Sequence, residues 1–352
     1  MPPPTSSDER TIRIIHDLIR EAGCEPDSFR GLLLTQQIET TLKMIADELD
    51  TGQLKLITNA LKEMRYAYTV FNQYRGIRKI AIYGSARTPE DHPDYLAAKS
   101  FSRAIAGEGW MAITGAGDGI MKAGHEGPQR KGSFGLSIRL PFETTANEVI
   151  EGDPKLINFR YFFTRKLMFM SHADAVAVFP GGFGTQDELF ETLTLVQTGK
   201  TNVIPIVLLE GEDGVYWEHW ARNIRKNFVE NGWIGEGDPD LYTIAHSTEG
   251  ALQHVLKFYA VYHSSRYVGD QLVMRLHRSL TENQLEQLND EFSSLVKEGC
   301  IKSCPALEGE TDHLDLPRIR FTHHRRNYSM LRRLIDRINE FAPMRTNSVK
   351  AT

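Results

Sequence analysis

The sequence predicts an α/β fold, with a Rossmann-like, doubly wound and mostly parallel sheet and with helical extensions at both ends of the chain. Between residues 78 and 245, short apolar runs alternate with helical stretches, which is the pattern of βαβ units. Outside this region, apolar residues recur at three- and four-residue steps, as they do in helices. We therefore expect three parts within the 352 residues: a helical N-terminal extension (1–77), a Rossmann-like domain (78–245) and a mainly helical C-terminal extension (246–352).

The N-terminal extension is predicted from helical periodicity alone. Two breaks divide it, one at the Pro-Asp-Ser of 26–28, where a serine can cap a helix, and one at the Asp-Thr-Gly of 50–52. Three groups of apolar residues result: Ile12, Ile15, Leu18 and Ile19, then Leu32, Leu33, Ile38, Leu42, Ile45 and Leu49, then Leu54, Ile57, Leu61, Met64 and Tyr68. We expect helices here and no catalytic group.

The Rossmann-like domain is predicted from buried strands that run into turns of small residues. The runs are KIAIYGSAR (79–87), WMAITGAGDG (110–119), SFGLSIRL (133–140), ADAVAVFPGG (173–182) and VIPIVLLE (203–210). Helical stretches lie between them, at 95–108, 119–130, 164–172 and 185–198. Strands and helices that alternate in this way form a parallel sheet with both faces covered.

The C-terminal extension is predicted as helices over 251–264 and 269–277, with an isolated strand over 314–322 and a final amphipathic helix over 328–341. Thr281 and Gln284 have the spacing of a capping box, in which the threonine bonds the backbone three residues on and the glutamine reaches back.

Composition and charge exclude several classes of protein. The hydrophobic share of 41%, the charged share of 25% and the net charge of −5 are those of an ordinary globular enzyme, and they give no reason to expect nucleic acid as a partner. No basic and apolar leader opens the chain and no apolar run is long enough to span a bilayer, so we expect a cytoplasmic protein that contacts no membrane.

The three cysteines are too few for a disulfide framework. Cys300 and Cys304 could bind zinc together with His313, His323 and His324, but the Cys-x₃-Cys spacing is loose and no second cysteine pair follows. We favour ordinary cysteines and expect no metal.

Three glycine-rich turns follow predicted strands, and ligands of open parallel sheets bind at such strand ends. The turns are Gly84-Ser85-Ala86-Arg87, Thr114-Gly115-Ala116-Gly117-Asp118-Gly119 and Pro180-Gly181-Gly182-Phe183-Gly184-Thr185. Glycine lets an anion approach the backbone, and the helix N-terminus that follows favours negative charge. The pattern predicts a phosphate site, although tight packing of strand on helix also selects glycine.

Two charged residues near the third turn are candidates for chemistry. Glu188 lies three residues beyond Thr185, which brings its carboxylate back over the crevice, although a carboxylate there also favours the helix dipole. Arg165 follows an aromatic run on the preceding helix and could clamp a phosphate or orient Glu188, or form a structural ion pair. Glu191, one turn further on, is expected to be solvated or supporting.

These residues resemble a known family. The segment FFTRKLMFMSHADAVAVFPGGFGTQDELFETLTLVQTGK, with YGSAR and TGAGDGIMKAGHEG, resembles the LOG ("Lonely guy") phosphoribohydrolases, long labelled possible lysine decarboxylases. The resemblance covers roughly residues 78 to 245. It implies hydrolysis of the N-glycosidic bond of a nucleoside 5′-monophosphate, such as AMP or a cytokinin ribotide, to free base and ribose 5-phosphate, without a cofactor. It also implies a homodimer or a higher homo-oligomer.

The resemblance assigns roles residue by residue. The family's catalytic pair falls on Arg165 and Glu188. Its substrate-binding positions fall on Ser85, Gly115, Gly117, Gly119, Lys166, Gly181, Gly182, Gly184 and Thr185. Asp118 departs from the family's glycine-rich pattern, which leaves the preferred base open.

Three other functions remain as alternatives. A lysine decarboxylase would need pyridoxal phosphate on a Schiff-base lysine, and Lys166 is the only lysine close to the motif. The same fold also occurs in non-catalytic nucleotide- or cofactor-binding proteins. Finally, a basic C-terminal segment could bind a polyanion, although we favour a solvated helix face whose arginines pair with acidic neighbours; it contains Arg318, Arg320, Arg325, Arg326, Arg332, Arg333 and Arg337.

Overall fold

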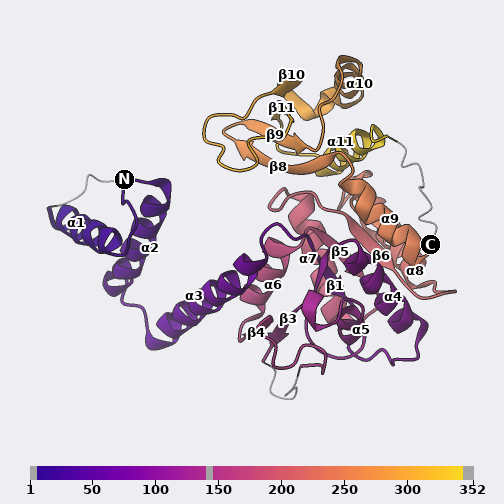
Figure 1. Ribbon diagram of the computed structural model, residues 1–352, viewed down its shortest axis with the longest axis horizontal. Coiled ribbons are helices and arrows are strands. Elements are labelled where there is room, and N and C mark those ends of the chain that lie inside the picture. Colours follow the sequence, from indigo (N-terminus) through magenta and orange to yellow (C-terminus); the bar gives the residue numbers. More distant parts are fainter. Residues whose placement is uncertain (1–5, 140–145, 344–352) are drawn as a thin grey trace, which may run out of the picture. The chain divides into compact units, whose positions relative to one another are not determined.

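The computed structural model describes residues 6–139 and 146–343 (Figure 1). The chain divides into two compact units, Met1–Lys62 and Glu63–Thr352. The last part of α3, from Glu63 on, therefore belongs to the larger unit, and the predicted boundaries after residues 77 and 245 remain predictions. Residue 140, the last of the predicted run 133–140, lies outside the described residues, as do residues 1–5 and 344–352 of the two extensions.

The smaller unit is helical, as predicted. It contains α1 (Ser6–Glu21), α2 (Phe29–Ala46) and the first part of α3 (Thr51–Phe71). The predicted break at 26–28 supplies the N-cap of α2, where the hydroxyl of Ser28 accepts the backbone N–H of Gly31 at 3.0 Å.

The larger unit is built on a seven-stranded, fully parallel sheet with the order β4-β3-β2-β1-β5-β6-β7. Its strands are β1 (Lys79–Tyr83), β2 (Met111–Thr114), β3 (Ser133–Ile138), β4 (Leu156–Phe159), β5 (Ala175–Val178), β6 (Ile206–Leu209) and β7 (Thr243–Ala245). Its connecting helices are α4 (Pro93–Gly107), α5 (Ile120–Glu126), α6 (Phe162–His172), α7 (Phe183–Gln197), α8 (Tyr216–Ile224) and α9 (Thr248–Phe258). The predicted α/β fold and its five predicted strands are confirmed.

Two hydrophobic cores lie on opposite faces of this sheet. Ile80 and Ile82 of β1 belong to the core formed with α4, α5 and α9, whereas Ala81 and Tyr83 belong to the core formed with α6, α7 and the end of α3. Because successive side chains of a strand point to opposite faces, this alternation shows that helices cover both faces.

The C-terminal segment differs from its prediction. It forms a four-stranded antiparallel sheet with the order β10-β11-β9-β8, together with α10 (Glu282–Phe292) and α11 (Tyr328–Glu340). The strands are β8 (Tyr262–Val268), β9 (Gln271–Leu276), β10 (Val296–Cys304) and β11 (Arg318–His323). The helix predicted over 269–277 is therefore wrong, and so is the end of the one predicted over 251–264, because a hairpin turn at Gly269 and Asp270 folds β9 back on β8. The capping box of Thr281 and Gln284 is confirmed.

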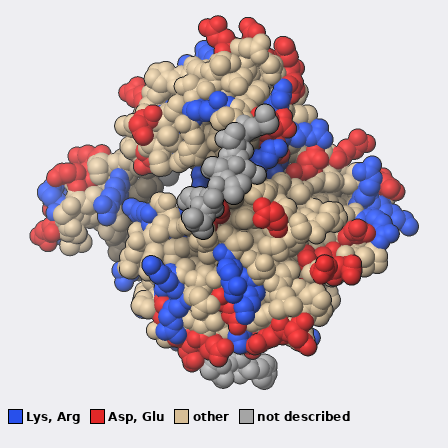
Figure 2. All heavy atoms as spheres, turned by 45° about the vertical axis from the view of Figure 1, so that its right-hand side comes forward, with Lys and Arg blue, Asp and Glu red and all other residues tan. Residues whose placement is uncertain are grey.

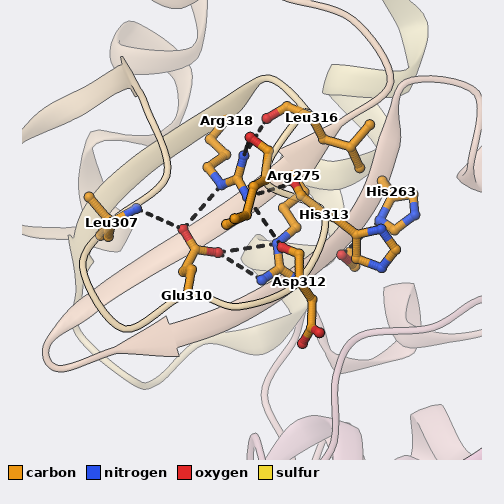
Figure 3. Close-up of polar contacts among 10 residues, drawn as sticks. His263, Arg275, Leu307, Glu310, Asp312, His313, Leu316 and Arg318 are labelled. Carbon is orange, nitrogen blue, oxygen red and sulfur yellow. Dashed lines mark hydrogen bonds and ion pairs between the residues drawn. The ribbon is translucent and has the colours of Figure 1, made fainter.

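A buried ion network anchors this second sheet (Figure 3). The carboxylate of Glu310 accepts from Arg275 Nη2 of β9 at 2.7 Å and from Arg318 Nε of β11 at 3.1 Å, and its side chain is 0% exposed. The backbone N–H of Leu307 donates to the same carboxylate at 3.0 Å. One carboxylate thus joins two neighbouring strands to the loop between β10 and β11.

Most arginines of the basic C-terminal segment pair with acidic residues inside the chain. Besides the Glu310 network, the pairs are Arg325 with Asp270, Arg332 with Asp336, Arg333 with Asp240, and Arg337 with Glu291 and Glu340. The predicted pairing with acidic neighbours is thus seen, but a solvated helix face is not, because Arg318 lies in β11 and both Arg318 and Arg332 are buried.

On the face of the molecule that Figure 2 shows, neither basic nor acidic side chains predominate. Figure 2 shows Lys and Arg side chains interspersed with Asp and Glu. Within residues 6–139 and 146–343, no helix is long and apolar enough to cross a membrane, and no group of three or more His, Cys, Asp or Glu residues could hold a metal ion. Cys300 is exposed and Cys304 is half-buried, and both are free thiols.

Candidate functional site

A cleft of about 1330 Å³ opens along the carboxyl edge of the parallel sheet. It is lined by the three predicted turns after β1, β2 and β5 and by side chains from α6 and α7. Nine predicted site residues line it: Ser85, Gly115, Gly117, Arg165, Gly181, Gly182, Gly184, Thr185 and Glu188. Segments far apart in the sequence meet here because carboxyl ends of parallel strands lie at one edge.

Backbone hydrogen bonds lock the three turns together. The N–H of Ser85 donates to Pro180 O at 3.1 Å, and the N–H of Ile120 donates to Ser85 O at 3.0 Å. Gly119 has a φ of +57°, and a Cβ there would lie 2.3 Å from Ser85 O. Gly119 therefore does not line the cleft; it allows the turn after β2 to pack on the turn after β1.

The turn after β5 leaves its backbone bare toward the cleft. A Cβ at Gly181 would lie 2.1 Å from Thr185 Oγ1, so this glycine is needed for packing. At Gly182 and Gly184, in contrast, a Cβ would meet no described atom within 4 Å. Gly182 is the N-cap of α7 and has no side chain to cap it, so within the described part of the chain the N–H groups of the first turn are free to face a ligand.

A hydrogen-bond chain from α8 holds this turn, and the sequence did not reveal it. The hydroxyl of Tyr216 donates to Gly181 O at 2.7 Å, and Gln186 Nε2 donates to that hydroxyl at 2.8 Å. Trp220 Nε1 donates in turn to Gln186 Oε1 at 2.8 Å. The aromatic composition of 216–220 is the only local signal, and it does not tell which turn these residues support.

The predicted pair of charges comes together at the cleft. Arg165 Nη2 lies 3.4 Å from Glu188 Oε1, and both side chains are nearly buried. The Arg165 guanidinium also lies near two aromatic rings of α6, at 5.2 Å from the centre of Phe162 and 5.9 Å from that of Phe169. Arginine and glutamate therefore hold fixed positions beside the bare turn.

The charge state of Glu188 is set by opposing effects. Its burial, at 7% exposure, raises the pKa of the carboxyl above its usual range, and the cations Lys166 and Arg165 oppose that rise. Lys166 Nζ lies 3.6 Å from Glu188 Oε2, 2.9 Å from Asp187 and 2.6 Å from Glu191. Although burial alone would lower the pKa of Lys166, these carboxylates raise it, so the ammonium is charged.

Lys166 thus does not line the cleft, although the sequence suggested that it binds substrate. Its ammonium holds Glu188 and Glu191 instead. Asp118, the departure from the family pattern, is exposed and does not line the cleft either.

The turn after β2 is supported by a buried polar group that the sequence did not predict. The side-chain amide of Asn147 donates to Gly117 O at 2.9 Å and to Ala116 O at 3.1 Å, and Ala116 has a φ of +66°. His125 Nε2 lies 3.0 Å from Phe134 O, which only accepts, so this nitrogen carries the proton, and Nδ1 faces Asn147. Burial lowers the pKa of His125, which keeps it neutral.

Tyr83 is a further cleft residue that the sequence did not single out. Its hydroxyl is buried and has no hydrogen-bond partner within the described part of the chain. Burial and the nearby charge of Glu188 raise the pKa of this phenol well above its usual value, so it remains a donor.

Comparisons with known proteins find relatives of the part of the chain that contains the parallel sheet. Residues 115–255 match the family model described as "Possible lysine decarboxylase". A cytokinin riboside 5′-monophosphate phosphoribohydrolase of Mycobacterium tuberculosis is 27% identical over 178 residues, which are 49% of this chain and 91% of that protein. A probable enzyme of the same name from Oryza sativa subsp. japonica is 27% identical over 177 residues, or 48% and 72% of the two chains.

Among solved structures, the molybdenum cofactor binding protein of Rippkaea orientalis is 21% identical, with a TM-score of 0.36, over 51% of this chain and 95% of its own. A likeness of this size does not bear on function. From the family match and the two distant relatives, the chain contains a domain of the possible lysine decarboxylase (LOG) family, distantly homologous to the cytokinin riboside 5′-monophosphate phosphoribohydrolases.

Proposed function

We propose that this protein hydrolyses the N-glycosidic bond of a nucleoside 5′-monophosphate, releasing the free base and ribose 5-phosphate. The observation that carries the proposal is the placement of the Glu188 carboxylate, 3.4 Å from Arg165, beside the uncapped N-terminus of α7. A carboxylate and an anion site are the two parts that this reaction needs.

The phosphate would bind at the turn after β5. The bare backbone of Gly182 and Gly184 and the positive end of the α7 dipole favour an anion there, and Arg165 supplies a full positive charge. Binding energy from this remote group then holds the ribose in place for the reaction.

Glu188 would act on the ribose. Cleavage of the bond from C1′ to the base builds positive charge on the sugar, so a carboxylate stabilises this oxocarbenium-like centre or activates the attacking water. Lys166 and Arg165 favour the charged form of Glu188, which either role requires. The hydroxyl of Tyr83, kept protonated, is a donor on the same wall of the cleft.

Lysine decarboxylation does not fit these residues. That reaction needs pyridoxal phosphate on a lysine that can become uncharged. No lysine is among the described residues that line the cleft, and the Lys166 ammonium is held by carboxylates that raise its pKa.

The test is incubation with AMP, GMP, CMP and UMP, followed by chromatography for free base. We expect Glu188→Gln to lower kcat by about 10²–10⁴-fold, because an acid–base or charge-stabilising group typically contributes this much. The matched control is Glu218→Gln, which removes an exposed glutamate from the first turn of α8. A protein that binds monophosphates without cleaving them would instead be a non-catalytic binding protein, and a fully active Glu188→Gln variant would exclude the mechanism.

A further inference from the structure

We propose that Glu63 is a positioning residue for the candidate active site, in that its carboxylate holds the N-terminal end of the helix that carries Arg165. The inference rests on the proposed function and extends it to the N-terminal helical region. Glu63 is the first residue of the larger unit and lies on α3, outside the region that matches the family model.

The cap consists of two hydrogen bonds across a long sequence separation. Glu63 Oε1 accepts from the backbone N–H of Arg160 at 2.8 Å, and Glu63 Oε2 accepts from Thr164 Oγ1 at 2.6 Å. Both donors lie at the N-terminus of α6. The N-cap residue, Tyr161, makes no side-chain capping bond. Among the described residues, Glu63 accepts no backbone N–H of the first turn; it ties the residue before the N-cap to the Thr164 side chain and adds a negative charge at the positive end of the helix dipole, and we call this pair of bonds the cap.

This cap lies next to the reacting groups without touching the cleft. Thr164 is 1% exposed, so without Glu63 its hydroxyl would keep the Tyr161 carbonyl, at 2.9 Å, as its acceptor, and Arg165 is the next residue. The guanidinium of Arg165 then reaches Glu188 at 3.4 Å. Glu63 itself is not among the residues that line the cleft. It therefore fixes where α6 begins, and through α6 the position of Arg165.

The attachment of α3 to the body of the larger unit does not depend on this glutamate. Ala67, Val70 and Phe71 of the same helix are buried in the hydrophobic core under the sheet. Removing the carboxylate leaves these contacts in place. Loss of Glu63 should therefore affect the start of α6 more than the stability of the fold.

The experiment compares kcat/KM for AMP hydrolysis in full-length variants. We expect Glu63→Ala to lower kcat/KM by about tenfold or more, because small misplacements of a positioning group are costly in rate. Glu63→Gln keeps an acceptor for the Arg160 N–H but loses the charge, so its kcat/KM should lie between those of Glu63→Ala and the wild type. This variant also replaces Glu63→Ala in the comparison if the alanine variant folds poorly. The control is Lys62→Ala, which removes an exposed neighbour that forms no ion pair within the described residues.

A double-mutant cycle separates positioning from general loss of structure. If Glu63 acts through Arg165, then Glu63→Ala should change kcat/KM less than twofold in an Arg165→Ala background, where there is no guanidinium left to misplace. Equal effects in both backgrounds, or full activity of Glu63→Ala, would overturn the proposal.

Amide hydrogen exchange distinguishes failure of this inference from failure of the proposed function. If the wild type cleaves no monophosphate, the proposed hydrolase activity is excluded, but the cap can still be measured. Faster exchange at the start of α6 in Glu63→Ala than in Lys62→Ala supports the cap, and equal exchange rules it out.

Discussion

At the scale of single residues, the chemistry depends on how the charge of Glu188 is balanced. Burial raises the pKa of this carboxyl, and the charges of Lys166 and then Arg165 lower it again. Arg165 faces the cleft, whereas Lys166 approaches the carboxylate from outside it. Lys166 therefore tunes Glu188 without an expected contact to substrate, and this role can be tested separately.

We predict that Lys166→Met moves the acidic limb of the pH profile of kcat/KM to higher pH. The substitution removes a cation that favours ionised Glu188 and leaves the carboxylates of Asp187 and Glu191 beside it, so the pKa of Glu188 rises further. The active, ionised form then disappears at a higher pH as the solution is acidified. On the alkaline side of this limb the variant should approach wild-type activity.

The measurement is the pH dependence of AMP hydrolysis by Lys166→Met, with Lys131→Met, an exposed lysine that forms no ion pair in the described residues, as the control. An acidic limb that stays in place or moves to lower pH would contradict the role of Lys166 as the tuning cation.

At the scale of elements, the start of α7 is the part that the proposed phosphate site needs most. Its two outer glycines, Gly182 and Gly184, have free space where a Cβ would be, whereas Gly181 does not. Packing inside the protein therefore explains only Gly181. The openness at the other two positions is what a bound anion would use.

We predict that Gly182→Ala and Gly184→Ala each weaken AMP binding by about tenfold or more, while the thermal unfolding midpoint stays near that of the wild type. The added methyl meets no protein atom but occupies the approach of the phosphate, and at Gly184, inside α7, alanine is also the better helix former. Isothermal titration calorimetry with AMP measures the affinity.

Gly181→Ala is the contrasting variant, because its methyl would meet Thr185 and should lower stability as well. Unchanged affinity of both outer variants would place the phosphate elsewhere in the cleft.

The helices and strands show which parts of the fold could be predicted from local sequence patterns. The five predicted strands of the parallel sheet are apolar runs, and their burial on both faces makes the pattern visible. β4 and β7 were not predicted, because they are edge strands of four and three residues and lack such a run. In the second sheet, Gly269-Asp270 is a two-residue hairpin signal, but neither β8 (YHSSRYV) nor β9 (QLVMRL) alternates polar and apolar residues, so the pattern did not indicate strands.

The candidate site also has a part that local sequence patterns predicted and a part that they did not. Local motifs predicted the glycine turns, Arg165 and Glu188, because each turn directly follows its strand. Support from distant elements could not be predicted: Glu63 bonds Arg160, 97 residues away and just before α6, and Asn147 reaches Gly117 across 30 residues. No local pattern encodes such pairings.

At the scale of the whole molecule, the parallel sheet and the antiparallel C-terminal sheet share one hydrophobic core. Met168 and Leu189 of the first part belong to the same buried cluster as Met274 and Phe321 of the second. The Glu63–Thr352 unit should therefore unfold as one cooperative body, although its strands form two separate sheets.

We predict that Glu310→Ala destabilises this entire unit by about 3–5 kcal/mol, because it leaves Arg275 and Arg318 buried without a counter-charge. All four tryptophans lie between Trp110 and Trp233, in the α/β part, so urea unfolding followed by their fluorescence reports on the sheet that does not contain Glu310. Cooperative unfolding requires the fluorescence midpoint to fall with the substitution.

The destabilisation should also depend on pH. Although burial alone would raise the pKa of Glu310, the Leu307 N–H and the two arginines hold it below its usual range. The carboxylate therefore stabilises the fold fully above the pKa of an unfolded glutamate, about 4.3, and this contribution is lost as pH falls through the lower folded value. The difference between wild type and Glu310→Ala should accordingly be largest near neutral pH and shrink in acid. If the tryptophan midpoint stays unchanged while amide exchange in β9 and β11 accelerates, the C-terminal sheet unfolds on its own, and the shared core does not couple it to the candidate active site.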